Sequence, residues 1–142
     1  MKLLKEGKTP KPSQVDKWTG RYSDMLLKER GNRISRTETA AATEQARFDA
    51  FRQGMDHKGY PPEYAIKEWR HGGGGMKTRE QHVAENETEV RGLYTPFRMP
   101  DGTLIQYPHA PDIPAKHGIN CTCSLLIRMD WAGLKRDGWI VR

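Results

Sequence analysis

The chain has 142 residues, of which 35% are hydrophobic and 30% are charged, and its formal net charge at pH 7 is +6. This length suits one domain that buries a core without disulfides, while the composition predicts a modest core with part of the chain in arms and loops. No apolar run is as long as a membrane-spanning helix and residues 1–11 lack the hydrophobic block of a secretory signal, so we expect a protein of the cytosol, or one assembled there, without a membrane partner.

The positive charge is concentrated near the N-terminus. Residues 1–36 contain ten Lys or Arg and four Asp or Glu, whereas residues 37–142 contain fourteen of each. A basic segment is attracted to phosphate backbones or to an acidic protein surface. The alternative is a solvated, lysine-flanked helix without a dedicated nucleic-acid role. The candidate residues for binding DNA or an acidic partner are Lys2, Lys5, Lys8, Lys11, Lys17 and Arg21.

In chain order, the first predicted segment is a flexible basic arm over residues 1–13, where glycine and prolines occur among lysines. Apolar residues at spacings near three and four predict an amphipathic helix over residues 15–30 that ends at Gly31. A second helix is predicted over residues 32–53, with Gly54 as its terminator. The N-terminal part of the chain is therefore expected to be helical.

The second predicted helix carries an alanine-lined apolar stripe with a carboxylate at its edge. Glu38 lies one turn after Ile34, so we expect it to be a buried polar clamp that pairs with Arg36 or Arg79. A third, short helix is predicted to begin at Pro61 or Pro62 and to run through Trp69, because proline is tolerated in a first helical turn.

The second half of the chain predicts short strands and long loops. Asp101-Gly102 between two apolar stretches predicts a hairpin over residues 93–107, and a last strand is predicted over residues 120–128. Helices followed by strands indicate an α+β fold, with N-terminal amphipathic helices packed on a small C-terminal antiparallel β-sheet that has long Pro/Gly-rich loops. The expected domain spans residues 14–128, and residues 129–142 form a C-terminal tail.

Both cysteines, Cys121 and Cys123, lie one residue apart in the predicted last strand. Residues i and i+2 of a strand share a face, so the two sulfurs should lie side by side. A disulfide between them would close a ring too tight for ordinary bridge geometry, which favours free thiols in a reducing compartment. They either pack as small apolar side chains or, with His82 and either His109 or His117, supply a tetrahedral zinc site, and no other cofactor is expected.

His82 follows Arg79 by three residues, which places both side chains on one side of a helix if this segment is helical. The favoured interpretation is a structural hydrogen bond from His82 to Asn120 or to a backbone carbonyl. The alternative is a small nuclease or toxin-like enzyme that uses Arg79, His82 and Asn120, with Glu38 as a fourth member. The structural interpretation predicts one polar cluster of Arg36, Glu38, Arg79, His82 and Asn120. The histidines expected at exposed positions are His57, His71 and His109.

Five short islands follow one another along residues 22–126. They are Ile34–Thr39 before an alanine-rich helix, Lys67–Trp69, Arg79-x-x-His82, Pro96-Phe97 with Pro100–Gly102, and Tyr107-Pro108 leading to Asn120–Cys123. In this order they resemble the Mu F-like minor head protein family of tailed phages, also described as the phage head morphogenesis domain. The chain departs from the family's pattern at Thr122, where the family tends to have arginine, and at Gly74–Lys77, where it usually has an acidic residue.

The resemblance implies a virion protein that is produced in the host cytoplasm and acts in head morphogenesis. Such a minor capsid protein works near the portal, with capsid or scaffold proteins as its partners, and in some phages travels with the packaged DNA. We therefore expect a structural member of an oligomeric assembly and not an enzyme.

Overall fold

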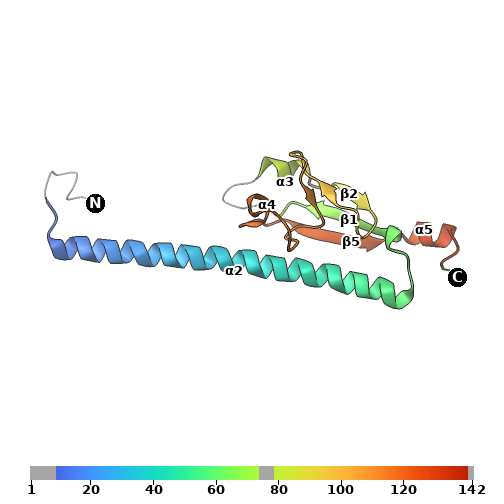
Figure 1. The fold of residues 1–142 in the computed structure, drawn as a ribbon, viewed down its shortest axis with the longest axis horizontal. Coiled ribbons are helices and arrows are strands. Elements are labelled where there is room, and N and C mark those ends of the chain that lie inside the picture. Colours follow the sequence, from blue (N-terminus) through green and yellow to red (C-terminus); the bar gives the residue numbers. More distant parts are fainter. Residues whose placement is uncertain (1–8, 74–78, 141–142) are drawn as a thin grey trace. The chain divides into compact units, whose positions relative to one another are not determined.

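The computed structural model describes residues 9–73 and 79–140. The long helix α2 comes first, and short elements follow it (Figure 1). In chain order they are α2 (Pro12–Lys58), the 3-10 turn η1 (Pro62–Tyr64), β1 (Ala65–Arg70), α3 (Glu80–Ala84), β2 (Glu89–Arg91), β3 (Phe97–Arg98), β4 (Leu104–Ile105), α4 (Ala115–Gly118), β5 (Ser124–Met129) and α5 (Trp131–Arg136). None of the helices in the described ranges combines the length and the apolar character needed to cross a membrane.

Helix α2 is continuous over 47 residues, so the predicted break at Gly31 is wrong (Figure 1). A glycine inside a helix costs only about 1 kcal/mol relative to alanine, which the helix formers around it offset. The predicted stop at Gly54 is also wrong. The chain leaves the helix at Gly59, whose φ of 67° is the left-handed conformation that commonly ends helices.

The chain divides into two units, residues 1–35 and residues 36–142. In the first unit, every described residue from Pro12 to Ser35 is exposed or half-buried. Several of its large apolar side chains are more than half exposed, among them Tyr22, Met25, Leu27 and Ile34. The helical state of this segment therefore rests on its own backbone and local contacts.

The second unit contains two antiparallel sheets. Strand β1 is the centre of the order β2-β1-β5, with Trp69 opposite Leu125, while β3 and β4 form a separate hairpin. Residues 65–69 of β1 are all buried. The hairpin predicted around Asp101-Gly102 is confirmed, with Gly102 at a φ of 81°.

The predicted helix over residues 61–69 is wrong, because only Pro62–Tyr64 form a 3-10 turn before the chain enters β1. Ile66 and Trp69 suit either a helix or a strand, and pairing with the distant β5 selects the strand. The predicted last strand begins later than expected, at Ser124, and a single turn of helix, α4, interrupts the proline-rich segment expected to be irregular.

The second half of α2 packs on the sheets of this unit. Its buried residues are Glu44, Phe48 and Met55, and the Phe48 ring stacks on Tyr107 with a centroid distance of 4.6 Å. The Glu44 carboxylate accepts a hydrogen bond from the Leu125 backbone N–H at 2.8 Å, which joins the helix to β5. The predicted α+β class is confirmed, with one long N-terminal helix in place of the separate helices that were predicted and with small antiparallel sheets in the C-terminal half.

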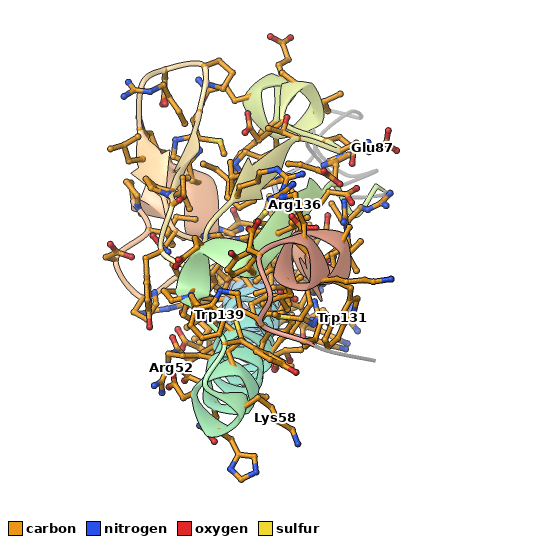
Figure 2. All side chains as sticks on the ribbon, turned by 90° about the vertical axis from the view of Figure 1, so that its right-hand side faces the viewer. Arg52, Lys58, Glu87, Trp131, Arg136 and Trp139 are labelled. Atoms are coloured by element: carbon orange, nitrogen blue, oxygen red, sulfur yellow. The ribbon has the colours of Figure 1, made fainter. Side chains whose placement is uncertain are left out.

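The C-terminal residues belong to this unit as well. Helix α5 buries Leu134, while Trp131 and Trp139 remain 57% and 51% exposed (Figure 2). The Trp131 ring meets Tyr60 edge-on at 6.0 Å. Two large aromatic surfaces are thus left largely in solvent.

Candidate metal centre

Two thiols and one imidazole meet in the interior of the second unit. The Nδ1 atom of His82 lies 3.3 Å from the Sγ atom of Cys121 and 3.4 Å from that of Cys123. The three potential ligand atoms all lie within 4.8 Å of one another. All three side chains are buried, at 1%, 7% and 4% exposure respectively. Both cysteines are free thiols, as the sequence predicted.

The sheet register brings a second histidine to this cluster. Arg70 is paired with Ser124 at the end of the β1–β5 ladder, so one residue further along His71 faces Cys123. The distance from His71 Nδ1 to Cys123 Sγ is 3.6 Å. The backbone N–H of His71 donates to the Asn86 side chain at 2.8 Å, which holds this end of the strand.

A glycine is required beside the two cysteines. A Cβ atom on Gly72 would lie 1.9 Å from the carbonyl oxygen of Thr122, a distance that no side chain can accept. The backbones on either side of the cluster therefore approach each other closely. Gly72, the first of four consecutive glycines in the sequence, is therefore needed for packing.

A chain of hydrogen bonds extends from His82 away from the thiols. His82 Nε2 lies 3.1 Å from His117 Nδ1, and His117 Nε2 lies 3.1 Å from Asp101 Oδ2. The two imidazole rings are nearly parallel, at 16°. Lys116 also donates to the same carboxylate oxygen of Asp101, at 2.6 Å.

This chain of hydrogen bonds defines the tautomer of each histidine. Hydrogen bonds from Lys116, and then from Thr103, hold the pKa of Asp101 far below its usual value, so its carboxylate only accepts. His117 must then donate through Nε2, and since burial lowers its pKa it stays neutral and accepts through Nδ1. His82 consequently carries its proton on Nε2. Its Nδ1 lone pair faces the two sulfurs.

The two thiols share their protons unequally. A hydrogen bond from Cys123 is the main cause that lowers the pKa of Cys121 strongly, with help from His82. The same interaction, together with burial, raises the pKa of Cys123 far above its ordinary value. The opposite shifts of the two pKa values share one main cause, the interaction between the two neighbouring sulfur groups.

The exposure predicted for the remaining histidines is only partly correct. His109, expected to be exposed, is 2% exposed, and neither of its ring nitrogens has a hydrogen-bond partner in the described part of the chain. His71, also expected to be exposed, is half-buried, whereas His57 is exposed as predicted. His117, one of the two predicted zinc ligands beside His82, contacts His82 on the ring nitrogen that faces away from the thiols.

The predicted polar cluster does not form as one group. Arg36 and Glu38 are exposed, so the expected buried clamp at Glu38 is wrong; Glu38 lines an open groove with Ala41 and Ile119. Arg79 donates to the backbone carbonyl of Ile119. His82 bonds neither to Asn120 nor to a backbone carbonyl in any described contact.

Helix α2 contacts the segment before the cysteines, but not through the side chain of Glu38 as predicted. The backbone N–H of Asn120 donates to the Thr37 hydroxyl at 3.1 Å, and Asn120 has a φ of 54°, which asparagine tolerates well. The buried carboxylate on α2 is Glu44. Its spacing from Ala41 and Phe48 puts it on the apolar stripe, a signal in the sequence that the prediction did not use.

The predicted basic binding residues lie in the first unit. Lys11, Lys17 and Arg21 are exposed, while Lys2, Lys5 and Lys8 lie outside the described residues. Comparisons of the chain with protein-family models, with curated proteins and with solved structures found no match in any of the three.

Proposed function

We propose that this chain is a minor head protein of a tailed phage or prophage, a structural component that acts in head morphogenesis near the portal. The observation that carries the proposal is that four of the five islands of the resemblance to the Mu F-like family lie around one buried cluster, and the first island contacts the segment that leads into it. If the likeness were a coincidence, there would be no reason for separate islands to lie together in the structure. A fold shared with the family would bring them together.

The contacts between the islands are specific. The Trp69 ring lies edge-on against both His82 and Phe97, each at a centroid distance of 5.4 Å. Asp101 completes the hydrogen bonds of His117, which orients His82, and Thr37 accepts from the backbone of Asn120. Four of the five islands therefore contribute to the surroundings of His82, Cys121 and Cys123, and the first island contacts the backbone of the neighbouring Asn120 through Thr37.

The geometry gives less support to the nuclease or toxin-like alternative. A general acid must reach the substrate, but His82 is 1% exposed and both its ring nitrogens face buried partners. Glu38 is exposed and has no described contact with Arg79 or His82. Cleavage of DNA or RNA by the purified chain, lost in a His82→Ala variant that keeps its melting temperature, would favour the alternative.

The first unit offers a surface for assembly partners. Val15, Trp18, Tyr22 and Met25 follow the alternating spacing of three and four residues that is typical of helix-to-helix packing. Tyr22 and Met25 are 60% and 54% exposed. In the proposed function this stripe, and the exposed Trp131 and Trp139, become buried against portal, capsid or scaffold proteins, so that the chain works as part of an oligomeric assembly.

Basic side chains adjoin this stripe. Lys17, Arg21 and Lys28 recur at spacings of four and seven residues, so they lie on one side of the helix. They fit an acidic partner helix, and contact with packaged DNA is the secondary role that the resemblance suggests. Because either attraction is electrostatic, binding should weaken as salt is raised.

The test is incorporation into particles. The chain should be coexpressed with the portal, capsid and scaffold proteins encoded beside it, and proheads purified by density should then contain it. A Tyr22→Asp/Met25→Asp variant should fold normally but be lost from the particles, while Glu29→Ala, an exposed change on the same helix, should be retained. Particles that assemble without the wild-type chain would contradict the proposal.

A further inference from the structure

We propose that Cys121, Cys123, His82 and His71 together bind one structural zinc ion. Two thiolates and two imidazoles form a set that zinc takes in tetrahedral structural sites, and soft sulfur ligands disfavour magnesium and calcium. The proposal rests on the positions of these four side chains and is independent of the proposed role in head assembly.

The separations among the ligand atoms of His82, Cys121 and Cys123 are close to those of a tetrahedral site. With zinc–sulfur bonds of about 2.3 Å and zinc–nitrogen bonds of about 2.0–2.1 Å, sulfur and nitrogen ligands on one ion lie about 3.6 Å apart. The His82 Nδ1 atom lies 3.3 Å and 3.4 Å from the two sulfurs, and His71 Nδ1 lies 3.6 Å from Cys123 Sγ. His71 lies at the edge of this group of three ligand atoms, and its side chain must move toward His82 and Cys121 to share one ion with them.

The fourth ligand is assigned to His71 because of the sheet register. The β1–β5 ladder ends at the pair Arg70 and Ser124, next to His71 and Cys123, and the Nδ1 atom of His71 lies 3.6 Å from the Cys123 sulfur. His117 contacts the nitrogen of His82 that faces away from the thiols, which excludes it from the same ion. His109 is the competitor, because it is buried near Cys121 with both ring nitrogens unpartnered among the described residues.

The hydrogen bonds behind His82 are those that a metal-ligating histidine requires. A ligating imidazole typically donates its other N–H to an acceptor, which fixes the ring's orientation and tautomer. Here His82 donates through Nε2 to His117, and His117 donates to the Asp101 carboxylate. The Nδ1 lone pair of His82 is thereby directed at the two sulfurs.

Such an ion would add a direct link at one end of the paired strands β1 and β5, where the Trp69 ring already contacts His82. It would join the end of β1, the short helix α3 and the residues before β5. Four protein ligands in a buried site leave no open coordination position, so the ion would stabilise the fold and would not activate a substrate. We therefore expect removal of zinc to lower the melting temperature.

The first experiment measures the metal content of the untagged, full-length chain purified under reducing conditions. Elemental analysis should find about one zinc ion per chain, and Cys121→Ser, Cys123→Ser and His71→Ala should each lower that content severalfold. His57→Ala, at an exposed histidine, is the matched control and should retain the metal. A wild-type chain that contains no zinc and takes up none from a zinc-buffered solution would overturn the proposal.

Cobalt substitution provides a readout of the site in the wild-type chain, which does not depend on any variant. Titration of the zinc-depleted wild-type chain with cobalt should produce the thiolate-to-cobalt charge-transfer bands and the strong visible bands of a tetrahedral site. His71→Ala should weaken the visible bands, while His109→Gln should leave them unchanged. Loss of the bands in His109→Gln with retention in His71→Ala would overturn the assignment of the fourth ligand, and a spectrum without thiolate bands would overturn the site.

Discussion

The two parts of helix α2 share one backbone conformation but differ in what surrounds them. In residues 36–58 the helix buries Glu44, Phe48 and Met55 at 3–7% exposure. In residues 12–35 every side chain is exposed or half-buried, including Leu27 at 63% exposure. Helical propensity therefore extends across both parts, whereas burial depends on the sheets of the second unit. The predictions below test this difference.

The largest effect is expected from Phe48→Ala in the packed part of α2. Removing a buried aromatic side chain that stacks on Tyr107 should lower the free energy of unfolding by about 3–4 kcal/mol. Leu27→Ala in the exposed part is the matched control and should change it by less than about 0.5 kcal/mol. Urea unfolding of both variants measures the contrast, and equal losses would show that the first part is packed in solution.

The next largest effect is expected from Glu44→Ala. This change leaves the buried Leu125 N–H without an acceptor and removes one of the partners of Arg47, which should cost about 2–3 kcal/mol. Glu44→Gln keeps an acceptor oxygen and should recover part of the loss. Glu29→Ala breaks only an exposed ion pair with Arg33 and should be nearly neutral. A neutral result at Glu44 would contradict its role as the connection between α2 and β5.

A third prediction concerns pH and Lys67, whose ammonium group is buried below the Phe97 ring and donates to the Gln106 carbonyl. Burial lowers the pKa of Lys67 from 10.5 to about 8. Between these values the unfolded chain binds more protons than the folded chain, so the free energy of unfolding should rise with pH across this window. Below pH 8 both states are protonated and the cost of burying the charge is present in full.

Lys67→Met should remove this rise, which we expect to be on the order of 1–2 kcal/mol after allowance for screening by solvent. The measurement is the difference between wild-type and variant unfolding free energies at several values from pH 7.5 to 10.5. Lys58→Met, at an exposed position, is the control, and its free energy of unfolding should change with pH as that of the wild type does. A constant difference between wild type and Lys67→Met would contradict the lowered pKa.

The smallest effect is expected from Gly31→Ala in the exposed part of α2. A Cβ at this position meets nothing within 4 Å, so alanine should stabilise the local helix by about 0.5–1 kcal/mol. Amide hydrogen exchange over residues 28–34 should slow by about two- to fivefold. Gly59→Ala is the opposite control, because its positive φ makes alanine unfavourable there. Unchanged exchange would indicate that residues 28–34 are not helical in solution.

Some of the candidate site could be predicted from local spacing. Two cysteines at i and i+2 in an extended segment predict neighbouring sulfurs, and the structure confirms neighbouring free thiols. His82 was a zinc candidate for the same site. His71 was not, because its place opposite Cys123 depends on β1 being a strand, and the apolar spacing there had favoured a helix.

The errors on α2 have a related origin. Glycine is a frequent helix terminator, but only when the backbone takes a positive φ, and the sequence does not distinguish Gly31 from Gly59 in that respect. Glu38 and Glu44 both lie near the apolar stripe. Which carboxylate is buried depends on where the Leu125 N–H lies across from the helix.

The sequence by itself determined the helical character of the N-terminal part, the α+β class, the hairpin at Asp101-Gly102 and the adjacency of the thiols. These features depend on interactions between residues close in the chain, so periodicity and turn chemistry are sufficient to predict them. Only the tertiary structure decided which part of α2 is buried and which histidines reach Cys121 and Cys123. Those features arise from strand pairing and packing between distant segments, whose energies no local pattern contains.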